Sequence, residues 1–173
     1  MRRVDCTLAR HGAAILAIFN DAILHSTALY EYRPRSPESM AGWFAAKAAG
    51  GYPVVGIEDT DGELLGFASY GAFRPHAAYK YSVEHSVYVR ADRRGRGIGR
   101  QLLQAVIAAA GGQGYHLLVG GIDATNPASI ALHERCGFTH AGTIRQAGFK
   151  FGRWLDLAFY QLLLATPAHP TDG

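Results

Sequence analysis

The chain has 173 residues, a formal net charge of +3 and only two cysteines. Hydrophobic residues make up 49% of it and charged residues 18%, which is ordinary for a folded protein and excludes a disordered chain. No apolar run approaches the ~20 residues that cross a bilayer, and no apolar segment follows the basic N-terminus as in a signal peptide. Cys6 and Cys136 are too few for a disulfide framework and lack C-x-x-C spacing, so we expect reduced thiols in a cytoplasmic protein. The length predicts a single domain over residues 1–173, with its core at about 4–164.

Local signals predict an alternation of strands and helices. Ser36-Pro37 and Asn126-Pro127 are typical helix starts, and Asp61-Gly62 between two apolar runs indicates a hairpin. The predicted elements are a strand at 4–8, helices at 13–24 and 36–50, strands at 53–57, 64–70 and 81–89, a helix at 97–110, a strand at 117–122, a helix at 126–136, and strands at 141–149 and 154–163. This order predicts an α/β fold with a mixed sheet and helices on both faces, followed by a frayed tail at 166–173.

The basic residues gather in one place, since five of the 17 lie between Arg90 and Arg100. There a predicted strand runs into an Arg/Gly loop that opens directly into a helix. Glycines let the backbone approach a ligand closely, and the free N–H groups of a helix N-terminus favour a phosphate. The loop is not a Walker A motif, and glycines at 95, 97 and 99 do not form G-x-G-x-x-G. We therefore expect one anionic ligand at this loop, with an ordinary Gly-rich turn as the plainer alternative.

Two segments resemble a known superfamily. Residues 94–99, Arg-Gly-Arg-Gly-Ile-Gly, resemble the acetyl-CoA motif of the GNAT N-acetyltransferases, and residues 126–138 resemble their Asn…Ala-x-x-Leu-Tyr-x-x-x-Gly-Phe segment. The resemblance covers nearly the whole chain. It implies a GNAT-like, mainly antiparallel sheet and transfer of an acetyl group from acetyl-CoA to a primary amine, without a metal.

Four further strings, at 69–71, 74–75, 83–89 and 148–156, resemble the phosphinothricin and methionine sulfone/sulfoximine acetyltransferase branch. This resemblance implies a small amino-acid-like acceptor and a homodimer. A protein or peptide N-acetyltransferase and a non-catalytic CoA-binding sensor stay open as alternatives. No aromatic platform or recognition helix accompanies the basic cluster, so neither nucleic acid nor membrane is an expected partner.

By the resemblance, the strand before the loop pairs with the pantetheine arm of CoA, the loop amides hold the pyrophosphate, and the next helix approaches the pantetheine. For Asn126, capping the helix is an equally good interpretation. The residues that this assigns to acetyl-CoA are Val87, Tyr88, Val89, Arg94, Gly95, Arg96, Gly97, Ile98, Gly99, Arg100, Asn126 and Ser129.

The resemblance also implies two catalytic residues. Strand alternation puts Glu84 and His85 on opposite faces, and Glu84 is the candidate base for the attacking ammonium, directly or through a water. A surface carboxylate is the plainer interpretation. His133 stands where the superfamily often has a Tyr that protonates the departing thiolate. Whether His133 is an acid or only positions the sulfur stays open, as does a simple packing role.

Acceptor binding is expected from the loop before this strand and from the strand itself. Arg74 is the candidate for gripping the oxygens of a carboxylate or sulfone, because Arg binds a planar carboxylate with two hydrogen bonds; an exposed loop arginine is nearly as good an interpretation. The residues assigned to the acceptor are Arg74, Pro75, His76, Glu84, His85 and Ser86.

Overall fold

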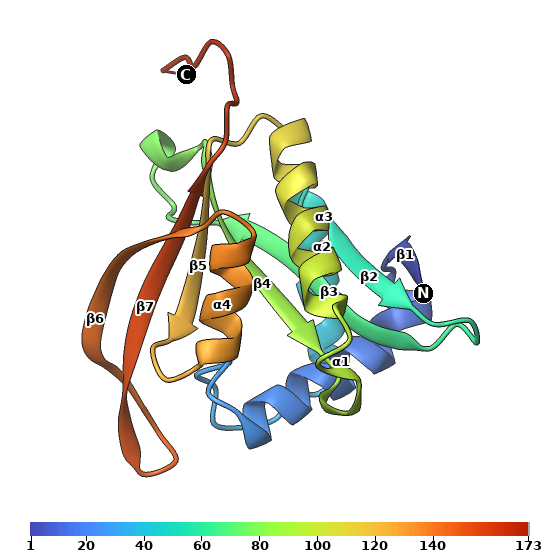
Figure 1. Ribbon diagram of the computed structural model, residues 1–173. Helices are drawn as coiled ribbons and strands as arrows, with labels where there is room; N and C mark the ends of the chain where they lie inside the picture. Colours follow the sequence, from blue (N-terminus) through green and yellow to red (C-terminus); the bar gives the residue numbers. More distant parts are fainter. Residues whose placement is uncertain (173) are drawn as a thin grey trace.

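The computed structural model describes residues 1–172 (Figure 1). The predicted order of strands and helices is confirmed. In chain order the elements are β1 (Arg2–Asp5), α1 (Leu8–His25), α2 (Pro37–Ala49), β2 (Val54–Glu58), β3 (Leu64–Ala72), η1 (Ala77–Tyr79), β4 (Ser82–Val89), η2 (Ala91–Arg93), α3 (Ile98–Gly112), β5 (Leu117–Asp123), α4 (Pro127–Arg135), β6 (Thr139–Lys150) and β7 (Arg153–Leu163).

The start of the chain differs from the prediction. The first strand, expected at 4–8, ends at Asp5, and α1 begins at Leu8 rather than at residue 13. The reason is a helix cap: the Thr7 side chain accepts a hydrogen bond from the Arg10 amide. Such a cap stabilises the exposed first turn of α1, which apolar periodicity alone does not reveal.

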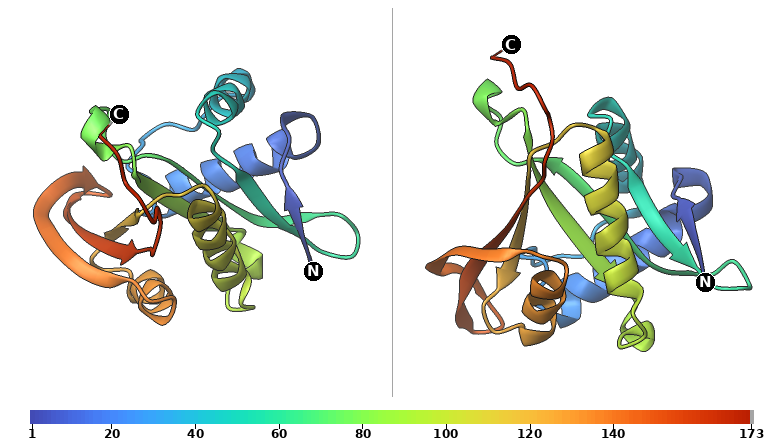
Figure 2. Two further views of the ribbon diagram at one scale, coloured as in Figure 1. Left: turned by 90° about the horizontal axis from the view of Figure 1, so that it is seen from above. Right: turned by 45° about the horizontal axis from the view of Figure 1, so that its top comes forward.

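Seven strands form one sheet in the order β1-β2-β3-β4-β5-β7-β6. Every neighbouring pair is antiparallel except β4 and β5, which are parallel. Helices α1 and α2 cover one face and α3 and α4 the other (Figure 2). The predicted mixed, mainly antiparallel sheet with helices on both faces is therefore confirmed.

Both faces of the central strands are buried. Under α3, Leu102 and Val106 pack with Val83 of β4, and all three are fully buried. On the other face, Ile15 of α1 packs with Phe67 of β3. Burial on both sides fixes the strand register, because a slip of one residue would exchange the two faces. The register in turn fixes which β4 side chains face α1 and which face α4.

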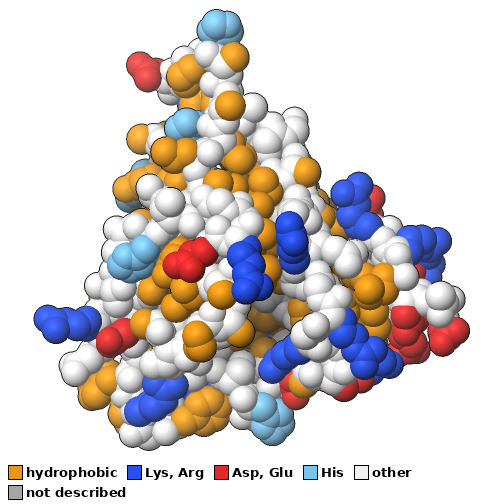
Figure 3. Space-filling view, viewed as in Figure 1, with side chains coloured by type: hydrophobic (Ala, Val, Ile, Leu, Met, Phe, Trp, Pro, Cys, Tyr) orange, Lys and Arg blue, Asp and Glu red, His pale blue; other side chains and the backbone are white. Residues whose placement is uncertain are grey.

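Strands β4 and β5 separate part-way along their length. They pair only from Ser82 opposite Leu117 to Glu84 opposite Val119, and β5 then follows β7 along its whole length. No strand of the described chain pairs with the β5-facing edge of β4 beyond Glu84. Figure 1 shows the two strands diverging, and Figure 3 shows a hollow on this side with Lys and Arg side chains beside it. The exposed backbone there can pair with an extended ligand.

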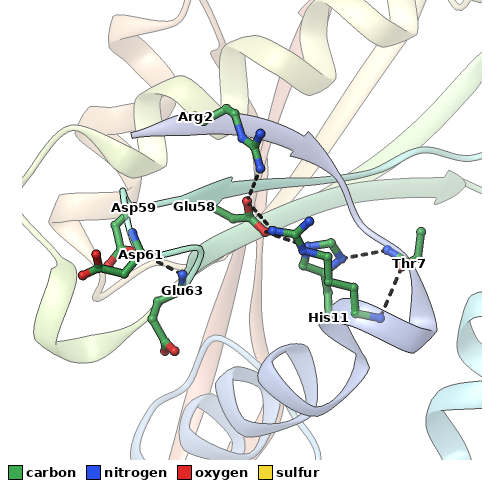
Figure 4. Close-up of polar contacts among 8 residues, drawn as sticks. Arg2, Thr7, His11, Glu58, Asp59, Asp61 and Glu63 are labelled. Carbon is green, nitrogen blue, oxygen red and sulfur yellow. Dashed lines mark hydrogen bonds and ion pairs between the residues drawn. The ribbon is translucent and has the colours of Figure 1, made fainter.

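A polar cluster fastens β1 and α1 to β2 (Figure 4). The fully buried Glu58 carboxylate accepts hydrogen bonds from Arg2 Nη2 at 2.8 Å and Arg10 Nη2 at 3.1 Å. His11 Nδ1 accepts from the Thr7 amide at 2.9 Å, so its Nε2–H donates to Glu58 Oε1 at 3.0 Å. The hydrogen bonds from Arg2 and then His11 hold the pKa of Glu58 below its ordinary value. The cluster thus ties the outermost strand to the sheet.

After β7 the chain forms no helix or strand up to Asp172, although the Thr171 amide donates a hydrogen bond to Tyr81 Oη at 3.1 Å. Gly173, the last residue of the predicted tail, lies outside the described residues. Both cysteines are free thiols. Across residues 1–172, no helix combines the length and the apolar character needed to cross a membrane.

Candidate active site

The Arg/Gly loop lies at the end of the open β4 edge and leads into α3. Gly95 has φ = 75° and Gly97, the N-cap of α3, has φ = 77°, a left-handed conformation that glycine adopts without strain. No side chain caps the helix. The first N–H groups of α3 are therefore available to an anion, and the positive end of the helix dipole favours one.

The arginines around the loop fall into two groups. Arg90 binds Asp92 with two hydrogen bonds, at 3.0 and 3.1 Å, and is partly neutralised. Arg94, Arg96 and Arg100 are exposed. Arg94 Nη2 lies 4.0 Å from Asp21 Oδ2. The structure thus brings the residues predicted for the pyrophosphate, 94–100, together at one helix N-terminus with uncompensated positive charge.

Helix α4 closes the other side of the hollow. A Cβ on Gly99 would lie 3.3 Å from Leu132 Cδ2, so this glycine lets α3 and α4 approach closely. Asn126 Oδ1 accepts a hydrogen bond from the Ser129 amide at 3.0 Å. The side chain of Asn126 therefore caps α4, the alternative interpretation given above.

Glu84 lies on the sheet face that α1 and α2 cover. A Cβ on Gly121 would be 3.3 Å from Glu84 Oε1, so the missing side chain of Gly121 makes room for the carboxylate. Burial raises the pKa of Glu84 above its ordinary value, and the Arg74 guanidinium offsets part of that rise. Arg74 is exposed and lies over the Phe73 ring, with its Cζ 4.3 Å from the ring centroid. Glu84 is thus a carboxylate with strengthened basicity and a cation nearby.

Other predicted acceptor residues lie around Glu84. Pro75 and His76 are exposed in the loop between β3 and β4, and Ser86 is half-buried two residues along β4 from Glu84, on the same face. Tyr88 continues this face, and burial raises its pKa to about 12.

Two cations near this face gave no signal in the sequence. Lys47 Nζ donates a hydrogen bond to the Tyr70 carbonyl at 2.8 Å. It also lies 3.6 Å from where a Cβ on Gly71 would be, and Gly71 of β3 pairs with Glu84 of β4. Burial lowers the pKa of Lys47 to about 8. Arg35 is bonded to Glu31 through Nε and Nη2, and its Nη1 is buried without a hydrogen-bond partner.

The loop between α1 and α2 is fastened to the end of β6. Lys150 Nζ, which is almost fully buried, donates to the carbonyls of Ile23, Ser26 and Leu29 at 2.7, 2.9 and 2.6 Å. Tyr32 Oη donates to the Phe149 carbonyl at 2.6 Å. These contacts fasten the loop that carries Glu31 and Arg35 to the end of β6.

The two histidines assigned by resemblance meet on the opposite face of β4. His85 Nε2 and His133 Nε2 are 2.9 Å apart, and both side chains are buried. His133 Nδ1 lies 2.7 Å from the Ser129 carbonyl. A Cβ on Gly120 would lie only 2.9 Å from His85 Cε1, so the missing side chain of Gly120 makes room for the His85 ring. His85, predicted to face the acceptor, therefore packs against His133, on the side of the sheet away from Glu84.

Comparison with known proteins decides the family. The model of the acetyltransferase (GNAT) family matches residues 17–138, well over half of the chain. The chain belongs to the GNAT acetyltransferase family. An L-methionine sulfoximine/L-methionine sulfone acetyltransferase of Pseudomonas paraeruginosa is 51% identical over 150 residues, 87% of each chain. A phosphinothricin N-acetyltransferase of Alcaligenes faecalis is 38% identical over 86% of this chain and 75% of its own length. The structure of a Salmonella typhimurium acetyltransferase with acetyl-CoA superposes with a TM-score of 0.94 at 42% identity, over 99% of this chain and 98% of that one.

As a GNAT enzyme, the protein transfers an acetyl group from acetyl-CoA to a primary amine. Its residues fit acetyl-CoA as a substrate: the uncapped N-terminus of α3 and the exposed arginines suit a pyrophosphate, and the unpaired edge of β4 suits an extended chain with amide groups. Within residues 1–172, no group of three or more His, Cys, Asp or Glu side chains is placed to hold a metal ion.

Proposed function

We propose that the protein acetylates the α-amino group of an amino acid whose side chain ends in a tetrahedral, oxygen-bearing group, as in methionine sulfoximine, methionine sulfone or phosphinothricin. The observation that carries the proposal is the half-buried Glu84 carboxylate at the point where β4 and β5 separate, with the Arg74 cation beside it. The names of the relatives at 51% and 38% identity support the same acceptors.

The charges around Glu84 complement a zwitterion. Glu84 suits the α-ammonium group, while Arg74 and Lys47 carry positive charge that no carboxylate within 4.0 Å compensates among the described side chains. We assign Arg74 to the carboxylate or the sulfone oxygens of the acceptor, because its planar guanidinium can donate two hydrogen bonds at once. Pro75, His76 and Ser86 complete the acceptor side of this proposal.

In the proposed reaction, Glu84 accepts a proton from the acceptor ammonium, directly or through a water. The freed amine nitrogen forms a bond to the thioester carbonyl carbon, and the carbon–sulfur bond breaks. The second proton of the nitrogen passes to the departing sulfur, which leaves as a thiol, or to solvent, in which case the sulfur leaves as a thiolate. A backbone N–H of the β4 segment Val87–Val89 stabilises the oxyanion, since this edge has no strand partner toward β5. The loop 94–100 holds the pyrophosphate, and Asn126 and Ser129 approach the pantetheine arm.

Free-thiol release from acetyl-CoA tests the proposal. The panel contains methionine sulfoximine, methionine sulfone, phosphinothricin, ordinary amino acids and short peptides. We expect kcat/KM to be highest for the first three. Activity confined to peptides would replace the proposal by a peptide N-acetyltransferase, and acetyl-CoA binding without thiol release would replace it by a sensor.

Substitution of Arg74 separates acceptor binding from acetyl-CoA binding. We expect Arg74→Ala to raise KM for the acceptor and to leave KM for acetyl-CoA unchanged. Arg3→Ala, which removes an exposed arginine from the outermost strand, is the matched control. Equal acceptor KM values in the two variants would refute the role of Arg74.

We further propose that the enzyme works as a homodimer in the cytoplasm. The support for a second copy is the hairpin of β6 and β7, which exposes four large apolar side chains at between 46% and 59% of their area: Ile144, Phe149, Phe151 and Trp154. Sedimentation velocity of the wild type and of a Trp154→Ser variant tests this, and a monomeric wild type at micromolar concentration would refute it.

A further inference from the structure

The His85–His133 contact allows one assignment of hydrogens. A distance of 2.9 Å between two Nε2 atoms requires one hydrogen between them, donated by one ring and accepted by the other. A carbonyl oxygen can only accept, so the Ser129 carbonyl at 2.7 Å requires a hydrogen on His133 Nδ1. Neutral His133 therefore has a bare Nε2, and His85 Nε2–H is the donor.

The remaining nitrogen agrees with this assignment. His85 Nδ1 is then bare, and it is buried without any hydrogen-bond partner. Burial, and then the neighbouring His133, lower the pKa of His85 to about 3, while the Val119 backbone acts in the opposite direction. Burial also lowers the pKa of His133. Both rings are consequently neutral at physiological pH, and the opposite arrangement would place two lone pairs 2.7 Å apart.

The pair lies where the strands separate. His85 is the first residue of β4 after its last pair with β5, Glu84 opposite Val119. Its ring crosses over Gly120 of β5 to reach α4, and Phe138 packs on both rings with centroid distances of 5.1 and 5.2 Å. The side-chain hydrogen bond thus joins β4 to α4 at the point where the backbone bonds between β4 and β5 end.

We propose that His85 is a positioning residue, whose Nε2–H bonds the bare Nε2 of His133 and so fixes the orientation of that ring beside the diverging strands. Both nitrogens of His133 are then occupied, Nδ1 by the Ser129 carbonyl and Nε2 by His85. His133 has no free N–H for the departing sulfur and acts by shaping the thioester site. A thiol of pKa ~8.5 leaves tolerably well without an acid. The inference concerns the site of the proposed function, but its hydrogen-bond geometry stands without any acceptor.

Nitrogen-15 NMR of the histidine-labelled protein without substrates tests the assignment directly. We expect the Nδ1–H tautomer for His133 and the Nε2–H tautomer for His85. Two variants extend the test. His85→Gln keeps a donor of similar reach, whereas His85→Leu removes the donor and keeps an apolar side chain of similar size.

In His85→Leu the Ser129 carbonyl still holds the Nδ1–H tautomer of His133. We expect the nitrogen-15 resonance of His133 Nε2 to shift as its hydrogen bond is lost and kcat to fall between ~10- and ~100-fold, as for small displacements of reacting groups, with His85→Gln restoring most of both. An Nε2–H tautomer for His133 in the wild type would overturn the proposal. So would a His85→Leu variant in which the His133 Nε2 resonance and kcat are both unchanged. If His85→Leu does not fold, the wild-type tautomers and His85→Gln decide the matter. Expected tautomers in a protein that acetylates no acceptor would leave this inference intact and refute the proposed function.

Discussion

Replacing Glu84 by Gln removes the proposed base while keeping the size of the side chain. An acceptor amine with a pKa between ~8 and ~10.4 is only about 9% to about 0.04% free base at pH 7. Without a base, the reaction depends on this fraction, so kcat/KM at pH 7 should fall between ~11- and ~2500-fold. This range corresponds to about 1.4 to 4.6 kcal/mol and overlaps the 10²–10⁴-fold typical of general bases.

The dependence on pH distinguishes a base from a binding group. In the wild type, kcat/KM should fall as the pH drops through the pKa of Glu84, which burial raises above 4.5. In Glu84→Gln, kcat/KM should instead keep rising with pH until the amine itself titrates, so the gap between the two proteins closes at high pH. Stopped-time thiol assays from pH 5 to 10 measure both curves.

The control for Glu84→Gln is Glu38→Gln, which changes an exposed carboxylate in the first turn of α2. It should follow the wild type at every pH. Near-normal turnover in Glu84→Gln with an unchanged pH–rate profile would refute the assignment of Glu84 as the base. A defect that stays constant up to high pH would assign it to acceptor binding instead.

Three further predictions concern acetyl-CoA binding, the acceptor loop and stability. Gly97→Ala places a Cβ in open space but at φ = 77°, where a side chain strains the backbone. The free energy of unfolding should therefore fall by about 1–2 kcal/mol and Tm by ~2–8 °C. KM should rise for acetyl-CoA alone, and an unchanged KM would contradict this. Lys150→Met removes the ammonium that holds three loop carbonyls and should raise KM for the acceptor more than KM for acetyl-CoA in initial-rate assays. Glu58→Gln should lower Tm at pH 7. Because the pKa of Glu58 is below its ordinary 4.5 in the folded protein, its stabilisation is present above pH 4.5 and lost below, and calorimetry should show the Tm gap narrowing there.

Elements with local signals could be predicted from the sequence. Ser36 and Pro37 mark the start of α2, and the turn at Asp59–Gly62 joins β2 to β3, because caps and tight turns depend on residues adjacent in the chain. The start of α1 was predicted five residues late, since the Thr7 cap precedes a first turn without a buried stripe.

The site could be predicted only in part. Strand alternation correctly separates Glu84 from His85, but the partner of His85 is 48 residues away and comes from the packing of α4 on the sheet. The two glycines that make room for these side chains, Gly120 and Gly121, carry a weak signal, since glycine inside a strand often marks a close approach. Lys47 gave none, because its place near Glu84 depends on how α2 packs.

Identification of the product tests the central claim most directly. Methionine sulfoximine is incubated with acetyl-CoA and the enzyme, and the product is analysed by NMR while thiol release is followed in parallel. We predict one product, acetylated on the α-amino nitrogen and formed in step with the thiol. Thiol release without an acetylated acceptor, or acetylation at the sulfoximine nitrogen, would contradict it.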